Sequence, residues 1–143
     1  MIYCKSEMDL VREKAKELKL DAPRYFWIAP LTSLMDICNG FGSDAFPENL
    51  RKVLDWVYRK YKEIAAIHDV DYEFSDGTEE RRIIADDRFL TNGLIMWQNI
   101  YGWSRWINPV ALYSRHKLYT AHRLLRAFGK GAWLASYERK KNK

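Results

Sequence analysis

The amino-acid sequence predicts an all-α fold, and three observations lead to this prediction. Apolar residues recur every three or four positions over residues 47–72 and again over residues 78–97, as on one face of an α-helix. Sustained alternation of apolar and polar residues is missing, which leaves room for no more than a minor hairpin. The 143 residues contain no repeat or low-complexity segment. We therefore predict one domain over residues 1–143, an antiparallel helix pair with additional packed N- and C-terminal helices.

The first half of the chain contains two expected helices, separated by a turn region and a short apolar segment. Ser6 and Asp9 resemble a capping box in front of a highly charged surface helix. Turn-forming residues over 22–33 then lead into a short apolar segment at 34–38. Pro47 suits the first turn of a helix, and the apolar stripe that follows it predicts one continuous helix to Tyr72.

The second half begins with the partner of that long helix. Thr78 can cap it, and its expected buried stripe includes Ile83, Leu90 and Trp97. A further helix is expected to start at Asn108-Pro109 and to stop at Gly129.

Charge and cysteine content restrict the functional classes. The net charge of +5 predicts a weak attraction to phosphates or anionic lipid heads. Residues 126–143 hold many Lys and Arg against the single acid Glu138, and we interpret them as a solvated basic tail. Two cysteines make no disulfide scaffold, and the N-terminus lacks the apolar core of a signal peptide. We expect synthesis in the cytoplasm, followed by association with a virion or delivery to a membrane.

A first candidate site is His68-Asp69 with Tyr72. Helical phase places His68 on the apolar stripe and Asp69 about 100° away, at the stripe's edge where it still reaches solvent. Tyr72 lies one turn beyond His68 on the same face. An imidazole in an apolar wall beside a solvent-accessible acid suits a general base and a metal ligand. The alternative is a core histidine bonded to a backbone carbonyl.

A second candidate is Asp86, which lies on a stripe where acids seldom occur unless they are paired. If the two helices are antiparallel, Asp86 can face His68 and act as its orienting carboxylate. Periodicity does not separate Asp86 from Asp87. The alternative is a surface pair of acids bonded to Arg82 or Arg88.

A third candidate is the segment from Cys38 to Asp44, with glycines at 40 and 42. Glycines two apart let a backbone bend and expose its carbonyls on one side. Hard cations such as calcium prefer main-chain carbonyl and carboxylate oxygens. Carbonyls in this loop and the carboxylate of Asp69 could form such a site; the alternative is an ordinary turn.

Taken together, the glycine loop, the His-Asp-x-x-Tyr helix and the helix with an inward Asp resemble the phospholipase A2 superfamily. The resemblance covers residues 38–90 and is nearest to the disulfide-poor branch found in parvovirus capsids and phages. It implies calcium-dependent hydrolysis of glycerophospholipid sn-2 esters at a membrane surface. His68 would be the general base, Asp86 would orient it, and Tyr72 would hydrogen-bond Asp86. The implied calcium ligands are Asp69 and the carbonyls of Cys38, Gly40 and Gly42.

Two further functional hypotheses come from other features. Small phage domains without an established activity show a similar His-Asp-x-x-Tyr, with an upstream Asp and Pro like Asp44 and Pro47. That likeness implies a non-catalytic structural or assembly protein, with phage or secretion-particle proteins as partners. The basic tail raises a third hypothesis, nucleic-acid binding, which is the weakest because no stacking aromatics are interleaved with its charges.

Aromatic residues gather around Gly102. Trp97, Tyr101, Trp103 and Trp106 lie within ten residues, together with Arg105. Such a group suits the headgroup region of a bilayer. The alternative is a second small core beneath the C-terminal helix.

Overall fold

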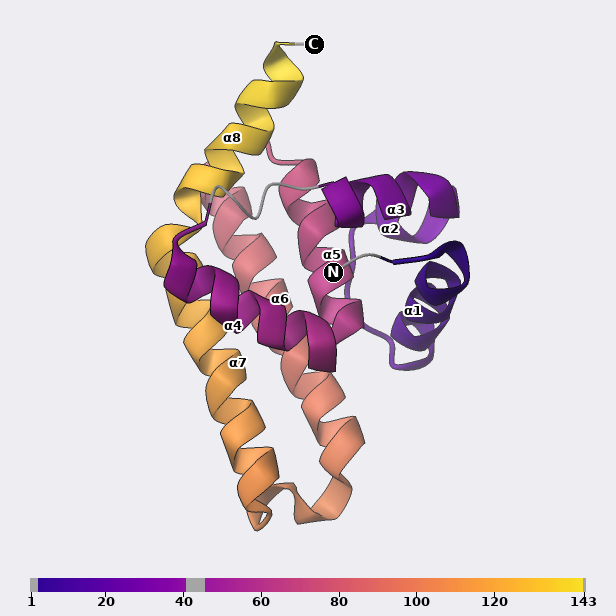
Figure 1. The fold of residues 1–143 in the computed structure, drawn as a ribbon, viewed down its shortest axis with the longest axis vertical. Coiled ribbons are helices and arrows are strands. Elements are labelled where there is room, and N and C mark those ends of the chain that lie inside the picture. Colours follow the sequence, from indigo (N-terminus) through magenta and orange to yellow (C-terminus); the bar gives the residue numbers. More distant parts are fainter. Residues whose placement is uncertain (1–2, 41–45, 143) are drawn as a thin grey trace.

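The computed structural model describes residues 3–40 and 46–142, and their regular structure consists of helices only (Figure 1). No strand occurs in these two segments, so the predicted all-α class is confirmed. The elements are α1 (Lys5–Glu17), α2 (Arg24–Ile28), α3 (Leu31–Gly40), α4 (Glu48–Lys60), α5 (Lys62–Glu73), α6 (Glu79–Tyr101), the 3-10 helix η2 (Gly102–Trp106), α7 (Pro109–Phe128) and α8 (Lys130–Lys141).

Helix α5 occupies the centre of the fold. It packs against α1, α2, α3, α4, α6 and α8, and every residue over 64–72 is buried. Ala65, Ala66, Ile67 and Val70 make it apolar on several faces, as expected for a helix without a solvent side. The polar residues of its second half therefore lie in the core, and α5 positions the candidate site.

The predicted continuous helix over residues 47–72 is wrong, because the chain breaks between α4 and α5. Tyr61 has φ −130° and ψ 63°, outside the helical region, although no glycine or proline is near. Its side chain is buried, its hydroxyl hydrogen-bonds Ser114 of α7, and its ring packs on Trp56. These tertiary contacts hold Tyr61 in the non-helical conformation, so that α4 lies on the surface while α5 enters the core.

Helices α6 and α7 form the long hairpin that projects at the bottom of Figure 1. Both expected starts are confirmed, because Thr78 caps α6 through the backbone N–H of Arg81 and Asn108 caps α7 through that of Val110. The expected stop of α7 at Gly129 is confirmed too. The two helices approach closely at Gly93, where an added Cβ would lie 2.9 Å from Leu118.

The two terminal helices differ from their expected descriptions. The capping box of α1 is formed by Cys4 and Glu7, two residues earlier than the expected Ser6 and Asp9. The basic tail is not simply solvated, because residues 130–141 form α8 and pack on α5 and α7. Trp133 anchors α8 by contacting the ring of Tyr72 and donating to the carbonyl of Thr78 at 3.0 Å. A buried Trp thus outweighs the high charge of this segment.

Candidate active site

His68 of α5 and Asp86 of α6 face each other across the interface of the two helices. Nε2 of His68 lies 3.4 Å from Oδ1 of Asp86, at the long end of hydrogen bonding. Asp86 is 0% exposed and His68 is 5% exposed. The choice between adjacent acids is thereby settled, because Asp87 points outward to His122 and Arg126 on α7.

Two further side chains hold Asp86. The hydroxyl of Tyr72 donates to Oδ1 at 2.8 Å, and Nη1 of Arg82 donates to Oδ2 at 3.2 Å. Arg82 also binds the carbonyls of Leu125 and Arg126 near the end of α7. The alternative of a surface acid bonded to Arg82 is therefore half right: Arg82 is the partner of Asp86, but both side chains are buried.

Aromatic rings fix the orientation of His68. Its ring centroid lies 4.3 Å from that of Tyr72 and 5.2 Å from that of Phe89. Because Nε2 faces Asp86, Nδ1 is the ring nitrogen that remains to take a proton, and it has no hydrogen-bond partner among residues 3–40 and 46–142. An imidazole held this way, with a carboxylate behind it, is the arrangement of a general base.

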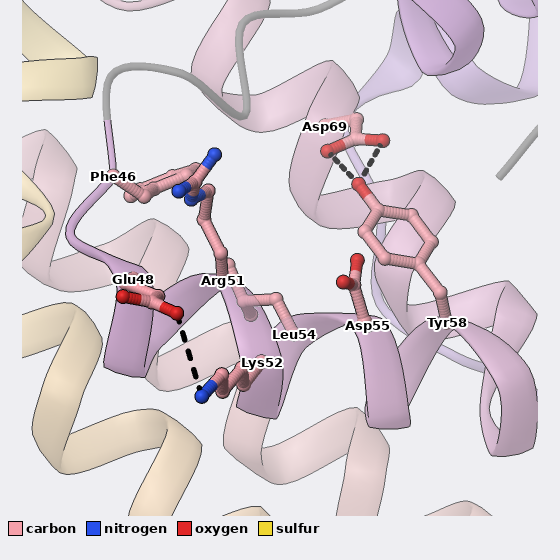
Figure 2. A pocket seen from close by; sticks show the side chains of 8 residues that line it. All are labelled: Phe46, Glu48, Arg51, Lys52, Leu54, Asp55, Tyr58 and Asp69. Carbon is pink, nitrogen blue, oxygen red and sulfur yellow. Dashed lines mark hydrogen bonds and ion pairs between the residues drawn. The ribbon is translucent and has the colours of Figure 1, made fainter.

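Asp69 lies on another side of α5, in a pocket of about 290 Å³ next to α4 (Figure 2). The sequence prediction that Asp69 reaches solvent directly is wrong, since only 6% of it is exposed, because α5 is covered on every side. The hydroxyl of Tyr58 lies 2.7 and 2.6 Å from its two carboxylate oxygens. His68 does not line this pocket. The lining residues are Phe46, Glu48, Arg51, Lys52, Leu54, Asp55, Tyr58 and Asp69.

Burial raises the pKa of Asp69 to about 7, and the hydrogen bond from Tyr58 only partly opposes this. The charges of His68 and of the N-terminal amine also lower this pKa, but together with the hydrogen bond from Tyr58 they offset burial only in part. A buried carboxylate is unfavourable when ionised unless positive charge is close to it, so a cation bound in the pocket would favour the ionised form.

The expected calcium ligands lie only partly in the predicted loop. Cys38 and Gly40 belong to the last turns of α3, so this stretch is helical, and Gly42 lies outside the described residues. Carbonyls in the last turn of a helix lack intrahelical partners, so α3 can still offer them. Cys38 is close enough that the charge of Asp69 adds to burial in raising the pKa of its thiol.

Asp69 and Asp55 bring carboxylates to this pocket, and carboxylate oxygens are ligands that a hard cation prefers. The pocket is also lined by the cationic Arg51 and Lys52, and no residue of α3 belongs to its lining. Three or more His, Cys, Asp or Glu side chains do not gather around any point within the described segments. A site of the zinc type is therefore not formed there, whereas a calcium site that uses main-chain carbonyls remains compatible with these residues.

The aromatic residues around Gly102 divide between buried and exposed positions. Trp97 is buried and donates from Nε1 to the carbonyl of Ala111 at 2.6 Å, so it belongs to the core. Trp103 and Trp106 are exposed. No helix among the described residues is both long and apolar enough to cross a bilayer.

The chain matches no protein-family model, no curated protein and no solved structure. Its function therefore has to be inferred from the geometry of its own residues.

Proposed function

We propose that the protein is a calcium-dependent hydrolase of glycerophospholipid sn-2 esters, with His68 as its general base. The observation that supports this most is the fully buried Asp86, joined at once to His68 and Tyr72. Burial strengthens electrostatic interactions, so Asp86 can stabilise an imidazolium next to it more than a surface acid could. The motif resemblance adds the substrate class.

The proposed reaction moves one proton through His68. Nδ1 takes a proton from water while the water oxygen forms a bond to the ester carbonyl carbon. Asp86 stabilises the resulting imidazolium through Nε2, and Tyr72 and Arg82 keep Asp86 in place. The bond to the alcohol oxygen then breaks, and that oxygen receives the proton from Nδ1. The products are a fatty acid and a lysophospholipid.

Asp69 would hold the calcium ion, together with carbonyls at the end of α3. When bound, the ion would polarise the ester carbonyl and stabilise negative charge on its oxygen. Asp69 follows His68 directly in α5, so one helix would carry both the base and the metal ligand.

A second candidate is a non-catalytic helical protein of a phage-like particle. It is favoured by Arg82, because a guanidinium at 3.2 Å already neutralises Asp86 and could make the cluster a purely structural one. The two roles predict different results when only the imidazole of His68 is removed. In the catalytic role ester hydrolysis is lost, whereas in the structural role there is no hydrolysis to lose.

The decisive experiment measures fatty-acid release from mixed phospholipid vesicles, with calcium and with a chelator. His68→Gln is compared with His122→Gln, since His122 also contacts an acid but lies nearer the surface. We expect calcium-dependent release by the wild type and by His122→Gln, and a loss of at least about a hundredfold in His68→Gln. Equal release by both variants would show that His68 is not the general base. No release by folded wild-type protein across several lipids would favour the structural role.

A further inference from the structure

The end of the α6–α7 hairpin exposes an unusual amount of apolar surface. We define the hairpin tip as residues 100–113, which contain the end of α6, η2 and the start of α7. Trp103 is 86% exposed, Ile107 is 73% exposed and Trp106 is 56% exposed. The other exposed apolar side chains of the tip are Ile100, Val110, Leu112 and Tyr113. Several large apolar side chains exposed together within a few turns of chain are typical of an interaction site.

The tip is held in place from beneath. Trp106 packs against the buried Trp97 with ring centroids 5.2 Å apart, and the guanidinium of Arg115 lies 5.2 Å from the Trp106 ring. Arg105 donates to the carbonyl of Gly102 at 2.8 Å, which closes the turn. The exposed side chains are therefore presented by an ordered turn, and binding need not fold it first.

The charged side chains at the tip and in the first turns of α7 are basic. Residues 100–117 contain Arg105, Arg115 and Lys117 and no Asp or Glu. Arg88 and Arg126, farther from the tip, pair with acids of the fold. Lys60 of α4 adds another charge, because its ammonium bonds the hydroxyl of Tyr101 at 2.5 Å. Lys117 lies over the ring of Tyr113, 5.5 Å from its centroid.

We propose that the hairpin tip binds the surface of an anionic bilayer, with its apolar side chains at headgroup depth. Tryptophan and tyrosine favour that depth, and neighbouring Lys and Arg pair with anionic lipid heads. Exposed Ile107 and Val110 favour a bilayer over a nucleic acid, because aliphatic side chains do not stack on bases. A second copy of the chain is a less suitable partner, because two equally basic tips would repel each other.

This inference does not depend on the proposed hydrolase activity. Asp86 and Gly102 are separated by sixteen residues of α6, about 24 Å at the rise of an α-helix. Binding at the tip and chemistry at His68 are therefore separable by mutation.

The test uses vesicles of ether-linked phosphatidylcholine, with or without ether-linked phosphatidylglycerol, because these lipids have no ester to hydrolyse. We expect the full chain to float with the anionic vesicles and its Trp fluorescence to shift to the blue. The double variant Trp103→Ser/Ile107→Ser should lower the partition coefficient about tenfold or more. Lys117→Gln should lower it about fivefold, and only with anionic vesicles.

Matched controls lie on α1 and α2, which pack away from the hairpin tip. Leu10→Ser/Ile28→Ser removes two apolar side chains of similar exposure, and Lys16→Gln removes a surface charge; both should bind as the wild type does. The proposal is overturned if folded wild-type protein binds neither vesicle, or if control and tip variants lose binding equally. Two further outcomes without vesicle binding would overturn it as well. One is a concentration-dependent dimer that only the tip variant abolishes, and the other is nucleic-acid binding that only the tip variant abolishes.

Discussion

The two ends of α6 depart from the usual distribution of polar and apolar residues in opposite ways. Near its start, Arg82 and Asp86 are charged and buried. Just beyond its end, Trp103 and Ile107 are apolar and exposed. Each charge of the first region has a partner within the fold, whereas the apolar side chains of the second extend away from it. The first region therefore contributes to stability as well as to a candidate function, and the second is free to serve binding alone.

The variant expected to have the largest effect on stability is Asp86→Ala. It removes the buried carboxylate that accepts from Tyr72 and Arg82 and leaves Arg82 paired with Glu79 alone, so we expect a loss of about 3–5 kcal/mol in the free energy of unfolding. Asp87→Ala removes the adjacent, exposed acid and should cost no more than about 1 kcal/mol. Denaturant unfolding of both variants measures the difference. Similar losses would mean that water reaches Asp86 in solution.

A second, similarly large effect concerns Asp69 and pH. The folded protein binds the Asp69 proton more tightly than the unfolded chain does, because the pKa is raised from 3.8 to about 7. Asp69 therefore lowers stability progressively as pH rises from about 4 to about 7, and by a constant amount above that. Asp69→Asn has no such proton and still accepts from Tyr58. Above pH 7 the free energy of unfolding of Asp69→Asn should exceed that of the wild type by on the order of 4 kcal/mol.

Thermal or denaturant unfolding of wild type and Asp69→Asn across this pH range measures the difference directly. Taking the difference between the two proteins cancels other titrating groups, including Asp71, whose pKa burial also raises, to about 6. A difference that does not vary with pH would show that Asp69 is ionised throughout.

Calcium should change the stability of the wild type in the same unfolding experiment, by a smaller amount. At a pH above 7, a ligand present at about a hundred times its Kd stabilises the folded state by about 2.7 kcal/mol. We expect calcium to raise the midpoint of wild-type unfolding and to leave Asp69→Asn unchanged. Glu48→Gln, on the rim of the same pocket and paired with Lys52, is a control that should still respond. Equal responses in all three proteins would place the ion elsewhere.

The smallest expected effect belongs to the hairpin tip. Trp103→Ser/Ile107→Ser should change the free energy of unfolding by no more than about 0.5 kcal/mol, because neither side chain is packed in the core. Trp97→Ser, only a few residues away, removes a buried ring and should cost about 3–5 kcal/mol. Denaturant midpoints distinguish the two. A large loss in the tip variant would show that the tip packs on the fold.

Helix starts and stops were the most predictable part of this fold. Thr78, Asn108 with Pro109, and Gly129 act on backbone groups only a few residues away, so they work before any tertiary contact forms. The break at Tyr61 had no such signal, because it depends on Ser114, which is 53 residues distant in sequence. Helix α8 was missed for a similar reason, since Trp133 is stabilised by Tyr72 and Thr78 and not by its basic neighbours.

The candidate site also has features that local sequence patterns predict and features that depend on tertiary contacts. By itself, the sequence determined the all-α class, the inward face of His68 and the presence of an acid at 86 or 87, because these follow from a period of 3.6 residues. Only the tertiary structure decided that Asp86 is the buried acid, that Arg82 joins it, that Asp69 is enclosed in a pocket and that Trp103 is exposed. Burial depends on which elements cover a helix, and periodicity along one helix carries no information about its neighbours.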